Sequence, residues 1–229
     1  MSVELTRARE FASSPDTRAK ILHATENLIV QEGPDVSLRR IAESAGVNIA
    51  SVHYHFGSKE GLIRAAMEEL AVPISEARIA ALEEYKKKSG DAPLKVEQIV
   101  EIFVRPYVCG VDGHRDAAHL LVRIALQNRV KPTPLTKSLL AQYLGPPAKI
   151  LVDALAKSLP HLSKEELYWR FHFTISLVYA SLTGLEPDGS FAKLAGDACD
   201  VTDDEAIVSQ LVAFISAGLK VPSTKKKRS

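Results

Sequence analysis

Cysteine is scarce in this sequence, and its two occurrences exclude the usual roles of clustered cysteines. Cys109 and Cys199 lie far apart and form no Cys-x-x-Cys pair. The sequence therefore predicts neither a disulfide framework nor a zinc ribbon. Such usage is typical of proteins in the reducing cytoplasm, which is where we expect this chain to act.

Long apolar runs are also missing. Residues 1–16 mix charged and apolar side chains and lack the apolar core of a signal peptide. No later stretch reaches the roughly 18 consecutive apolar residues that a membrane-spanning helix needs. We therefore expect no secretion signal and no membrane partner.

Charge of one sign is not in excess. The chain carries 29 lysines and arginines against 28 aspartates and glutamates, a formal net charge of +1 at pH 7. Any site for a polyanion must therefore be local. Hydrophobic residues make up 46% of the 229 positions, which is enough for a substantial buried core. The composition predicts a folded globular protein of one or two domains.

Sequence motifs of the common enzyme classes are absent too. The chain has no Gly-x-Ser-x-Gly, P-loop, His-Glu-x-x-His or glycine-rich dinucleotide motif, so nothing identifies a catalytic residue. Seven histidines occur, but His53 and His55 are two positions apart and would face different directions on a helix. We expect a binding protein with no metal and no cofactor, and an all-α enzyme is the less favoured alternative.

What the sequence does contain is helical periodicity along most of its length. Apolar residues recur every three or four positions, and no segment shows the alternation of a strand or a fixed-period repeat. The predicted fold class is therefore all-α. Pro73 lies inside a long helical pattern and should kink that helix or divide it in two. The predicted helices span about 17–32, 38–45, 48–55, 59–88, 94–111, 115–129, 134–159, 164–184 and 203–219.

Several of these helices begin at residues that cap helices well. Ser58 precedes the fourth helix, and a serine hydroxyl satisfies the free backbone N–H groups at such a position. Ser163 with Glu166, and Thr202 with Glu205, have the spacing of a capping box just before an apolar run. We therefore predict that Ser163 and Thr202 are the residues at which the last two helices start.

The second and third helices have the layout of a helix-turn-helix. Ser37 precedes a short helix that Gly46 closes, and another short helix follows over 48–55. A sharp turn between two short helices needs a residue that adopts a left-handed backbone conformation, which glycine does at little cost.

The sequence from Ser37 to Arg64, SLRRIAESAGVNIASVHYHFGSKEGLIR, resembles the DNA-binding signature of the TetR family of transcriptional regulators. The resemblance covers residues 17–64 strongly, and the remainder matches the family in its helical layout and length. It implies an N-terminal three-helix DNA-binding domain and a larger C-terminal helical domain for ligand binding and dimerisation. The motifs that carry it are Ile41-Ala42, Ala45-Gly46-Val47, Tyr54-His55-Phe56 and Ser58-Lys59-Glu60.

The resemblance also implies roles for ten residues at double-stranded operator DNA. The second helix of such a motif lies in the major groove, while neighbouring residues hold phosphates. Positions expected to contact bases or sugar edges are Asn48, Ala50, Ser51 and His53. Positions expected to hold phosphates are Ser37, Arg39, Arg40, Tyr54, His55 and Lys59. A structural cap is an equal alternative for His55, and the small core of this domain is expected to contain Val47, Ile49, Val52 and Phe56.

The predicted organisation is a flexible arm (1–16), the helix-turn-helix domain (17–60), the ligand-binding and dimerisation domain (61–221) and a basic disordered tail (222–229). Residues 1–70 carry eight basic and ten acidic side chains, a net charge of −2, whereas 36–59 carries three basic and one acidic, a net charge of +2. We expect modest affinity per monomer, so that dimerisation matters. Arg7 and Arg9 of the arm could reach a minor groove, although a frayed terminus is the simpler alternative.

The C-terminal half is expected to supply a homodimer interface and a pocket for a small-molecule effector. In the TetR family the last two long helices pack against their symmetry mates, which corresponds here to 164–184 and 203–219. Segment 166–173 also resembles members that respond to fatty acids or acyl-CoA thioesters. The candidate pocket residues are Arg105, Tyr107, His119, Arg123, Trp169, His172 and Tyr179. Core or interface packing is an alternative for most of them, and for His172 it is a hydrogen-bonded core position.

The predicted function is a repressor that binds a palindromic operator as a homodimer and is released by a small hydrophobic ligand such as a fatty acid or acyl-CoA. The alternative is a protein that binds DNA without sequence preference.

Overall fold

The computed structural model describes residues 15–90, 92–185, 187 and 189–223, and these residues contain helices and no strand. The predicted all-α fold is confirmed. The helices are α2 (Pro15–Glu32), α3 (Leu38–Ala45), α4 (Ile49–Phe56), α5 (Lys59–Ser89), α6 (Val96–Val108), α7 (Arg115–Val130), α8 (Pro134–Ser158), α9 (Lys164–Gly184), α10 (Ser190–Ala195) and α11 (Asp204–Lys220), with a short 3-10 turn at Gly196–Ala198. Arg7, Arg9 and the basic run 225–228 lie outside the described residues.

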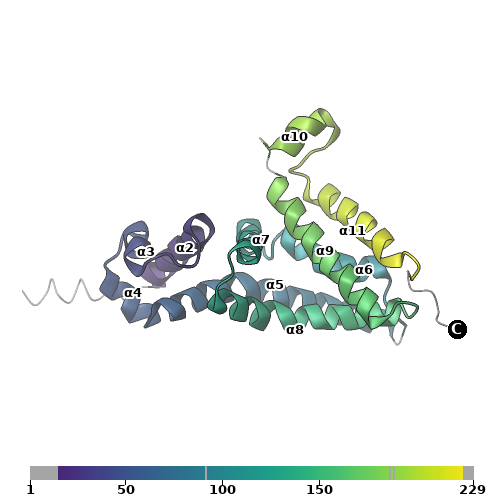
Figure 1. Cartoon of the computed structure of the whole chain (residues 1–229), viewed down its shortest axis with the longest axis horizontal. Helices are drawn as coiled ribbons and strands as arrows, with labels where there is room; N and C mark the ends of the chain where they lie inside the picture. The colour runs from purple at the N-terminus through teal and green to yellow at the C-terminus, as the bar shows by residue number, and fades with distance from the viewer. Residues whose placement is uncertain (1–14, 91, 186, 188, 224–229) are drawn as a thin grey trace, which may run out of the picture.

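Helices α2, α3 and α4 gather at one end of the molecule, on the left in Figure 1. Local hydrogen bonds define the two short helices. The Ser37 hydroxyl oxygen accepts from the Arg40 N–H at 3.2 Å at the start of α3, and Gly46 ends α3 with φ of 66°. Asn48 begins α4 by accepting from the Ser51 N–H at 2.8 Å. The predicted helix-turn-helix is therefore present, with α4 as its second helix.

Helix α5 connects this end to the rest of the molecule and runs alongside α8 (Figure 1). Ser58 begins it, as predicted, by accepting from the Gly61 N–H at 3.0 Å. Pro73 lies inside α5 and does not divide it. Pro73 is exposed, and the nearby residues Ala71 and Ile74 are buried, so α5 packs on the core on both sides of the proline.

The remaining helices form the larger body. Helix α6 packs against α5, α7, α8 and α11, and α9 packs against α7, α8 and α11. The predicted capping box at the start of α9 is confirmed, because the Ser163 hydroxyl oxygen accepts from the Glu166 N–H and the Glu166 carboxylate accepts from the Ser163 N–H. Among the described residues, no helix combines the length and the apolar character needed to cross a membrane.

The start of α11 differs from the prediction. Asp203, not Thr202, begins the helix, and its carboxylate accepts from the Ala206 N–H at 3.0 Å. The predicted box is absent because Asp200 accepts from both the Thr202 hydroxyl at 2.7 Å and the Thr202 N–H at 2.8 Å. Helix α10 was not predicted either; it is six residues long and buries none of them, so it has no apolar stripe to detect.

Candidate nucleic-acid interface

Helix α4 presents a mostly exposed surface that a DNA major groove could receive. Asn48, Ala50 and His53 are exposed, and Tyr54 is 71% exposed. A tyrosine this open is unusual for a side chain with a large ring, because burying the ring would stabilise the fold. Its ring contacts only the edge of the neighbouring His55 ring, with centroids 5.3 Å apart. The Tyr54 ring is therefore available for contact with a binding partner.

One prediction for α4 is wrong, and one predicted contact lies in unexpected surroundings. Ser51 is buried, and its hydroxyl donates to the Asn48 side-chain oxygen at 3.0 Å, which adds to the cap of the helix. This burial disfavours a base contact from Ser51. Ile49 was expected in the small core but is 46% exposed. Helix α4 has only two turns and buries only Ser51 and Val52, so the side chain at position 49 lies outside the buried face.

The residues predicted to hold phosphates lie at the starts of α3 and α5. Ser37 and Lys59 stand at the N-terminal ends of these helices, where free N–H groups and the helix dipole favour an anion. Arg39 and Arg40 are exposed, and each is paired in the isolated chain. The Arg39 guanidinium lies 3.0 Å from Glu43, and the Arg40 guanidinium lies 2.9 Å from Glu32. Such exposed pairs are weak, so a phosphate can replace the carboxylate.

The histidines of α4 differ in their surroundings. The His53 ring nitrogen Nδ1 lies 3.1 Å from the carbonyl oxygen of Gly57, which leaves the rest of its exposed ring available. His55 is half-buried, with its ring centroid 6.1 Å from that of Phe56. The Arg18 guanidinium covers the Phe56 ring at 5.4 Å. His55 thus sits at the margin of the surface, where both a structural and a phosphate-binding role remain compatible with its position.

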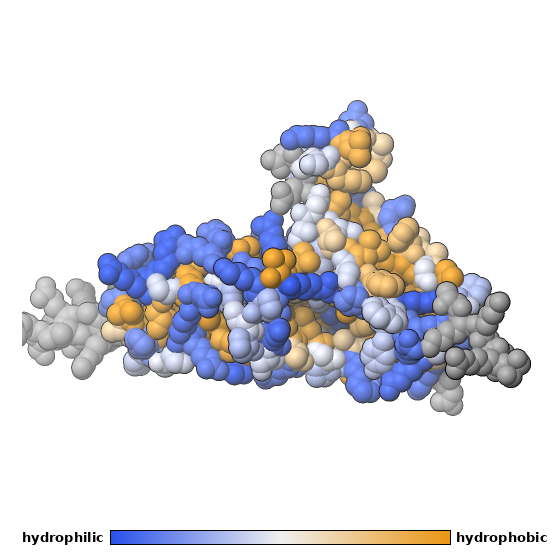
Figure 2. Space-filling model, in the orientation of Figure 1, coloured by the Kyte–Doolittle hydropathy of each residue, from blue (hydrophilic) through white to orange (hydrophobic). Residues whose placement is uncertain are grey.

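Helices α9 and α11 carry a second conspicuous surface. Trp169, Phe173 and Phe214 are 57%, 60% and 71% exposed, and Figure 2 shows apolar side chains gathered over these two helices. Between Phe173 and Phe214 lies a hollow of about 240 Å³. Arg170 joins the two helices, donating to the carbonyl oxygens of Leu219 at 2.8 Å and Pro222 at 3.1 Å. The apolar surface therefore has a fixed shape.

Two of the three predicted ligand residues on α9, Trp169 and His172, fall on this outer surface. Trp169 is exposed, and so is His172, whose ring packs edge-on against Trp169 and Phe173 with centroids 6.4 and 6.1 Å away. Neither the expected chamber nor the alternative core position is found for His172. The hydropathy of α9 is high on nearly every face, so sequence periodicity could not separate its inner face from its outer one.

Tyr107 and Tyr179 instead lie in the interior of the body, where their hydroxyl oxygens are 2.8 Å apart. Arg78 of α5 is 2% exposed and lies between the rings of Phe103 and Tyr107, with its guanidinium carbon 4.4 and 4.1 Å from their centroids. It donates to the Phe103 carbonyl oxygen at 2.7 Å and the Tyr107 hydroxyl at 3.3 Å. Burial raises the pKa of the Tyr179 hydroxyl well above its ordinary value. Within the described chain no carboxylate pairs with Arg78.

The other candidates are separated from this interior group. Arg105 is held by Glu101 and Glu205, at 2.7 and 2.6 Å, and these hydrogen bonds raise the pKa of its guanidinium. Arg123 is exposed on α7. His119 is partly buried, and burial lowers its pKa below the ordinary 6.5. The seven predicted residues thus do not line one cavity.

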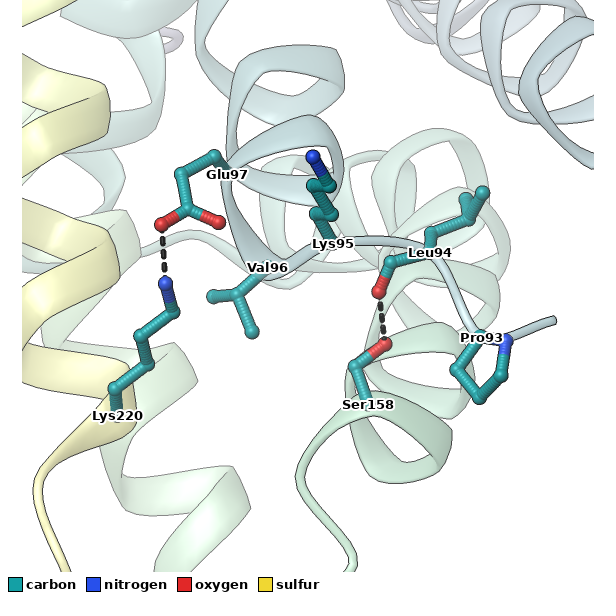
Figure 3. A pocket seen from close by; sticks show the side chains of 7 residues that line it. All are labelled: Pro93, Leu94, Lys95, Val96, Glu97, Ser158 and Lys220. Carbon is teal, nitrogen blue, oxygen red and sulfur yellow. Dashed lines mark hydrogen bonds and ion pairs between the residues drawn. The ribbon is translucent and has the colours of Figure 1, made fainter. Parts of the chain in front are cut away.

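A further hollow, of about 740 Å³, lies at the start of α6 (Figure 3). The Lys220 ammonium pairs with the Glu97 carboxylate beside it, and the Ser158 hydroxyl donates to the Leu94 carbonyl oxygen at 2.6 Å. These polar side chains are thus engaged within the chain, and none of the seven predicted ligand residues lines this hollow.

Sequence reasoning missed the two most unusual buried side chains, Arg78 and Glu26. Both had a signal. Arg78 falls on the apolar stripe of α5, four positions after Ile74 and four before Leu82. Glu26 falls on the buried face of α2, four positions after Leu22. A charged residue at a core position of an amphipathic helix is the pattern that finds both.

Comparison with known proteins agrees with this arrangement. The family model of bacterial regulatory proteins, tetR family, matches residues 21–66, and that of the tetracyclin repressor-like C-terminal domain matches residues 101–218. The chain is 42% identical over 84 residues to the HTH-type transcriptional regulatory protein RaaS of Mycobacterium tuberculosis, which is 37% of each protein. It is 32% identical over 80 residues to the HTH-type transcriptional regulator BetI of Stenotrophomonas maltophilia, 34% of this chain and 39% of that protein. The chain thus aligns with less than half the length of these relatives.

Solved structures share the fold over most of the chain. The ketosteroid transcriptional regulator KstR2 of Mycobacterium tuberculosis superposes with a TM-score of 0.57 at 16% identity, covering 90% of this chain and 96% of that one. The fatty acid degradation regulator FadR of Bacillus halodurans gives 0.56 at 16% identity, covering 91% and 98%. Because identity is so low, these likenesses show the fold alone. Together with the two matched family models, the capped helix-turn-helix and the all-helical body place the chain in the TetR family of DNA-binding transcriptional regulators.

Proposed function

We propose that this protein is a homodimeric repressor that reads an inverted-repeat operator through α4 and leaves it when a small hydrophobic ligand binds the body. The exposed surface of α4, fixed at both ends by local caps, is the observation that carries the proposal. Residues 17–60 form the DNA-binding domain in this proposal, and 61–221 form the ligand-binding and dimerisation domain.

The proposed DNA contacts follow from exposure and helix position. Asn48, Ala50 and His53 face outward on α4 and are assigned to base edges. Residues at helix starts and at the end of α4 are assigned to phosphates: Ser37, Arg39, Arg40, Tyr54, His55 and Lys59. Ser51 is left out because it is buried.

Dimerisation through α9 and α11 is supported by their apolar outer surface. Exposed aromatic side chains of this size are costly in water, and a second copy would cover them. A two-fold dimer places two copies of α4 in equivalent positions, and such an arrangement matches an inverted repeat.

The proposed ligand, such as a fatty acid or acyl-CoA thioester, is supported by the chemistry around Arg78. Its buried guanidinium has aromatic neighbours and no carboxylate among the described residues. An acidic or thioester head group with an apolar chain would satisfy both the charge and the aromatic walls. A ligand that prefers one body conformation shifts the population away from the DNA-binding form.

Selection of bound DNA from a genomic library, followed by competition at fixed salt, tests operator recognition. We expect an inverted repeat to be enriched and to resist random competitor DNA. His53→Ala should change the preferred bases, whereas Lys59→Ala should weaken binding to all sequences alike. Lys137→Ala, an exposed lysine of α8, is the control. Equal retention of random and selected DNA would instead indicate binding without sequence preference.

Thermal denaturation with fatty acids and acyl-CoA thioesters of increasing chain length tests the ligand. A ligand that binds the folded state raises the unfolding temperature, and the rise grows with the logarithm of its concentration relative to its Kd. Arg78→Met, which keeps the volume and removes the charge, should abolish the response to acids. A flat response of the unaltered protein across all chain lengths would reject this ligand class.

A further inference from the structure

A cavity of about 290 Å³ lies where the DNA-binding domain meets the body. It is distinct from the Arg78 group and from the α9 and α11 surface. Its walls come from α2, from α5 and from the segment that leads into α7. The lining residues are Glu26, Glu69, Leu70, Pro73, Ile74, Val111, Asp112, His114, Ala117 and Ala118.

The polar groups of this cavity are mostly acidic. Glu26, Glu69 and Asp112 contribute carboxylates and His114 an imidazole, while no lysine or arginine lines the cavity. Apolar side chains such as Leu70, Ile74 and Val111 form the rest. The cavity therefore combines a negative charge with an apolar wall, and its volume suits a small molecule.

Glu26 is the unusual member of the group. It is 7% exposed, and its Oε1 atom is buried with no hydrogen-bond partner. Burial and the nearby Glu69 carboxylate raise its pKa to about 7. Buried carboxylates are ordinarily hydrogen-bonded or paired with a cation, because water no longer stabilises the charge. Nothing described in the chain supplies that cation.

Nearby cations are engaged elsewhere. Arg18 of α2 covers the Phe56 ring and lines a separate hollow that includes Glu69. Arg115, the first residue of α7, pairs with Asp204 at 3.0 Å. Neither side chain lines the cavity, so its negative charge is not neutralised from within its walls.

The segment before α7 is held firmly in the shape that brings Asp112 and His114 to the cavity. Gly110 has φ of 74°, and a Cβ atom there would lie 2.5 Å from the backbone nitrogen of Arg115. Asp112 also adopts a positive φ of 51°, which non-glycine residues seldom do. These backbone conformations bring Asp112 and His114 to the edge of the cavity.

We propose that this cavity binds a small organic cation with an apolar body, whose charged group pairs with Glu26. The proposal goes beyond the operator and fatty-acid proposals and does not depend on either. An organic cation fits better than a metal ion, because no cluster of three or more histidine, cysteine, aspartate or glutamate side chains in the described chain could hold a metal. The bound molecule would touch α2 and α5 together.

Binding should strengthen as pH rises. Glu26 must lose its proton to pair with the cation, so affinity should increase about tenfold between pH 6 and pH 8. The other titratable groups that line the cavity are Glu69, Asp112 and His114. The carboxylates of Glu69 and Asp112 add to the attraction for a cation.

Isothermal titration calorimetry with benzylammonium, phenethylammonium and benzyltrimethylammonium tests the proposal on the full chain, without DNA. At pH 8 we expect at least one of these cations to bind once per chain, with benzyl alcohol and benzoate binding about tenfold more weakly or not at all. Glu26→Gln keeps the shape and removes the charge, and it should weaken cation binding about tenfold. Glu83→Gln, an exposed residue of the same α5, should bind as the unaltered protein does.

A second variant covers the case in which Glu26→Gln perturbs folding. Glu69 is exposed, so Glu69→Gln should fold normally and weaken cation binding several-fold. The proposal is overturned if none of the three cations binds better than benzyl alcohol, if the Glu26 and Glu69 variants bind like the unaltered protein, or if affinity falls between pH 6 and pH 8.

Discussion

Replacing Glu26 by glutamine should stabilise the protein at pH 8 far more than at pH 5. The folded protein raises the pKa of this buried carboxyl from the ordinary 4.5 to about 7. In the unfolded chain the side chain ionises near pH 4.5, whereas in the folded state it holds its proton until about pH 7. Ionisation of Glu26 therefore leaves the free energy of unfolding unchanged below pH 4.5 and lowers it increasingly as pH rises. The loss reaches its full size above pH 7.

The size of this effect follows from the two pKa values. A difference of about 2.5, from 4.5 to 7, corresponds to roughly 3 kcal/mol of lost stability above pH 7. About 0.8 kcal/mol of this loss is already present at pH 5 and about 3.3 kcal/mol at pH 8, so about 2.5 kcal/mol develops between the two pH values. Glutamine cannot ionise, so the variant does not undergo this loss. Its amide can also change the free energy of unfolding, but by the same amount at every pH.

Urea unfolding at pH 5 and pH 8 measures the effect, with protein concentration held fixed because any dimer adds to stability. The free energy of unfolding of Glu26→Gln minus that of the unaltered protein should rise by about 2.5 kcal/mol between the two pH values. The exposed Glu83→Gln serves as the control and should show no such rise. An equal difference at pH 5 and pH 8 would refute the reasoning.

Two further changes test the dimer surface and the turn. Phe214→Glu puts a charge at a position whose side chain is 71% exposed. In size-exclusion chromatography with light scattering, this variant should elute as a folded monomer, whereas the unaltered protein and a Lys137→Glu control should elute as dimers. A monomeric unaltered protein would contradict the prediction. Gly46→Ala should lower the free energy of unfolding, measured in urea, by about 1 kcal/mol, because alanine is strained at a φ of 66°. The added Cβ would meet no atom within 4 Å, so backbone conformation is the only cause of this loss. Gly145→Ala, in an equally open position inside α8, should raise the free energy of unfolding by up to about 1 kcal/mol. If both substitutions changed the free energy of unfolding in the same direction, backbone conformation would not be the cause.

Three helix starts were predictable because a serine provides the capping hydrogen bond within three residues. Ser37, Ser58 and Ser163 each begin the expected helix, because the hydroxyl and the N–H that it satisfies are fixed by the local chain. The start of α11 shows the limit of this reasoning. Asp200 and Asp203 both compete for nearby donors, and the sequence spacing at Thr202 does not tell which of them succeeds.

The candidate DNA-binding site was predictable in outline and not in detail. Its residues are close together in the sequence, so the motif locates α3, α4 and the start of α5. Whether a side chain of α4 faces outward depends on how α4 packs on its neighbours. That packing buries Ser51 and exposes Ile49, the reverse of the expectation for each.

The sequence alone determined that the chain is helical, where most helices begin and which segment carries the helix-turn-helix, since each depends on interactions between residues a few positions apart. Only the tertiary structure decided what each helix face meets. Periodicity marks Arg78 and Glu26 as inward-facing but does not reveal that aromatic rings enclose one and an acidic cavity adjoins the other. It likewise cannot reveal that Trp169 and His172 face outward, because contacts between distant helices decide which faces are covered.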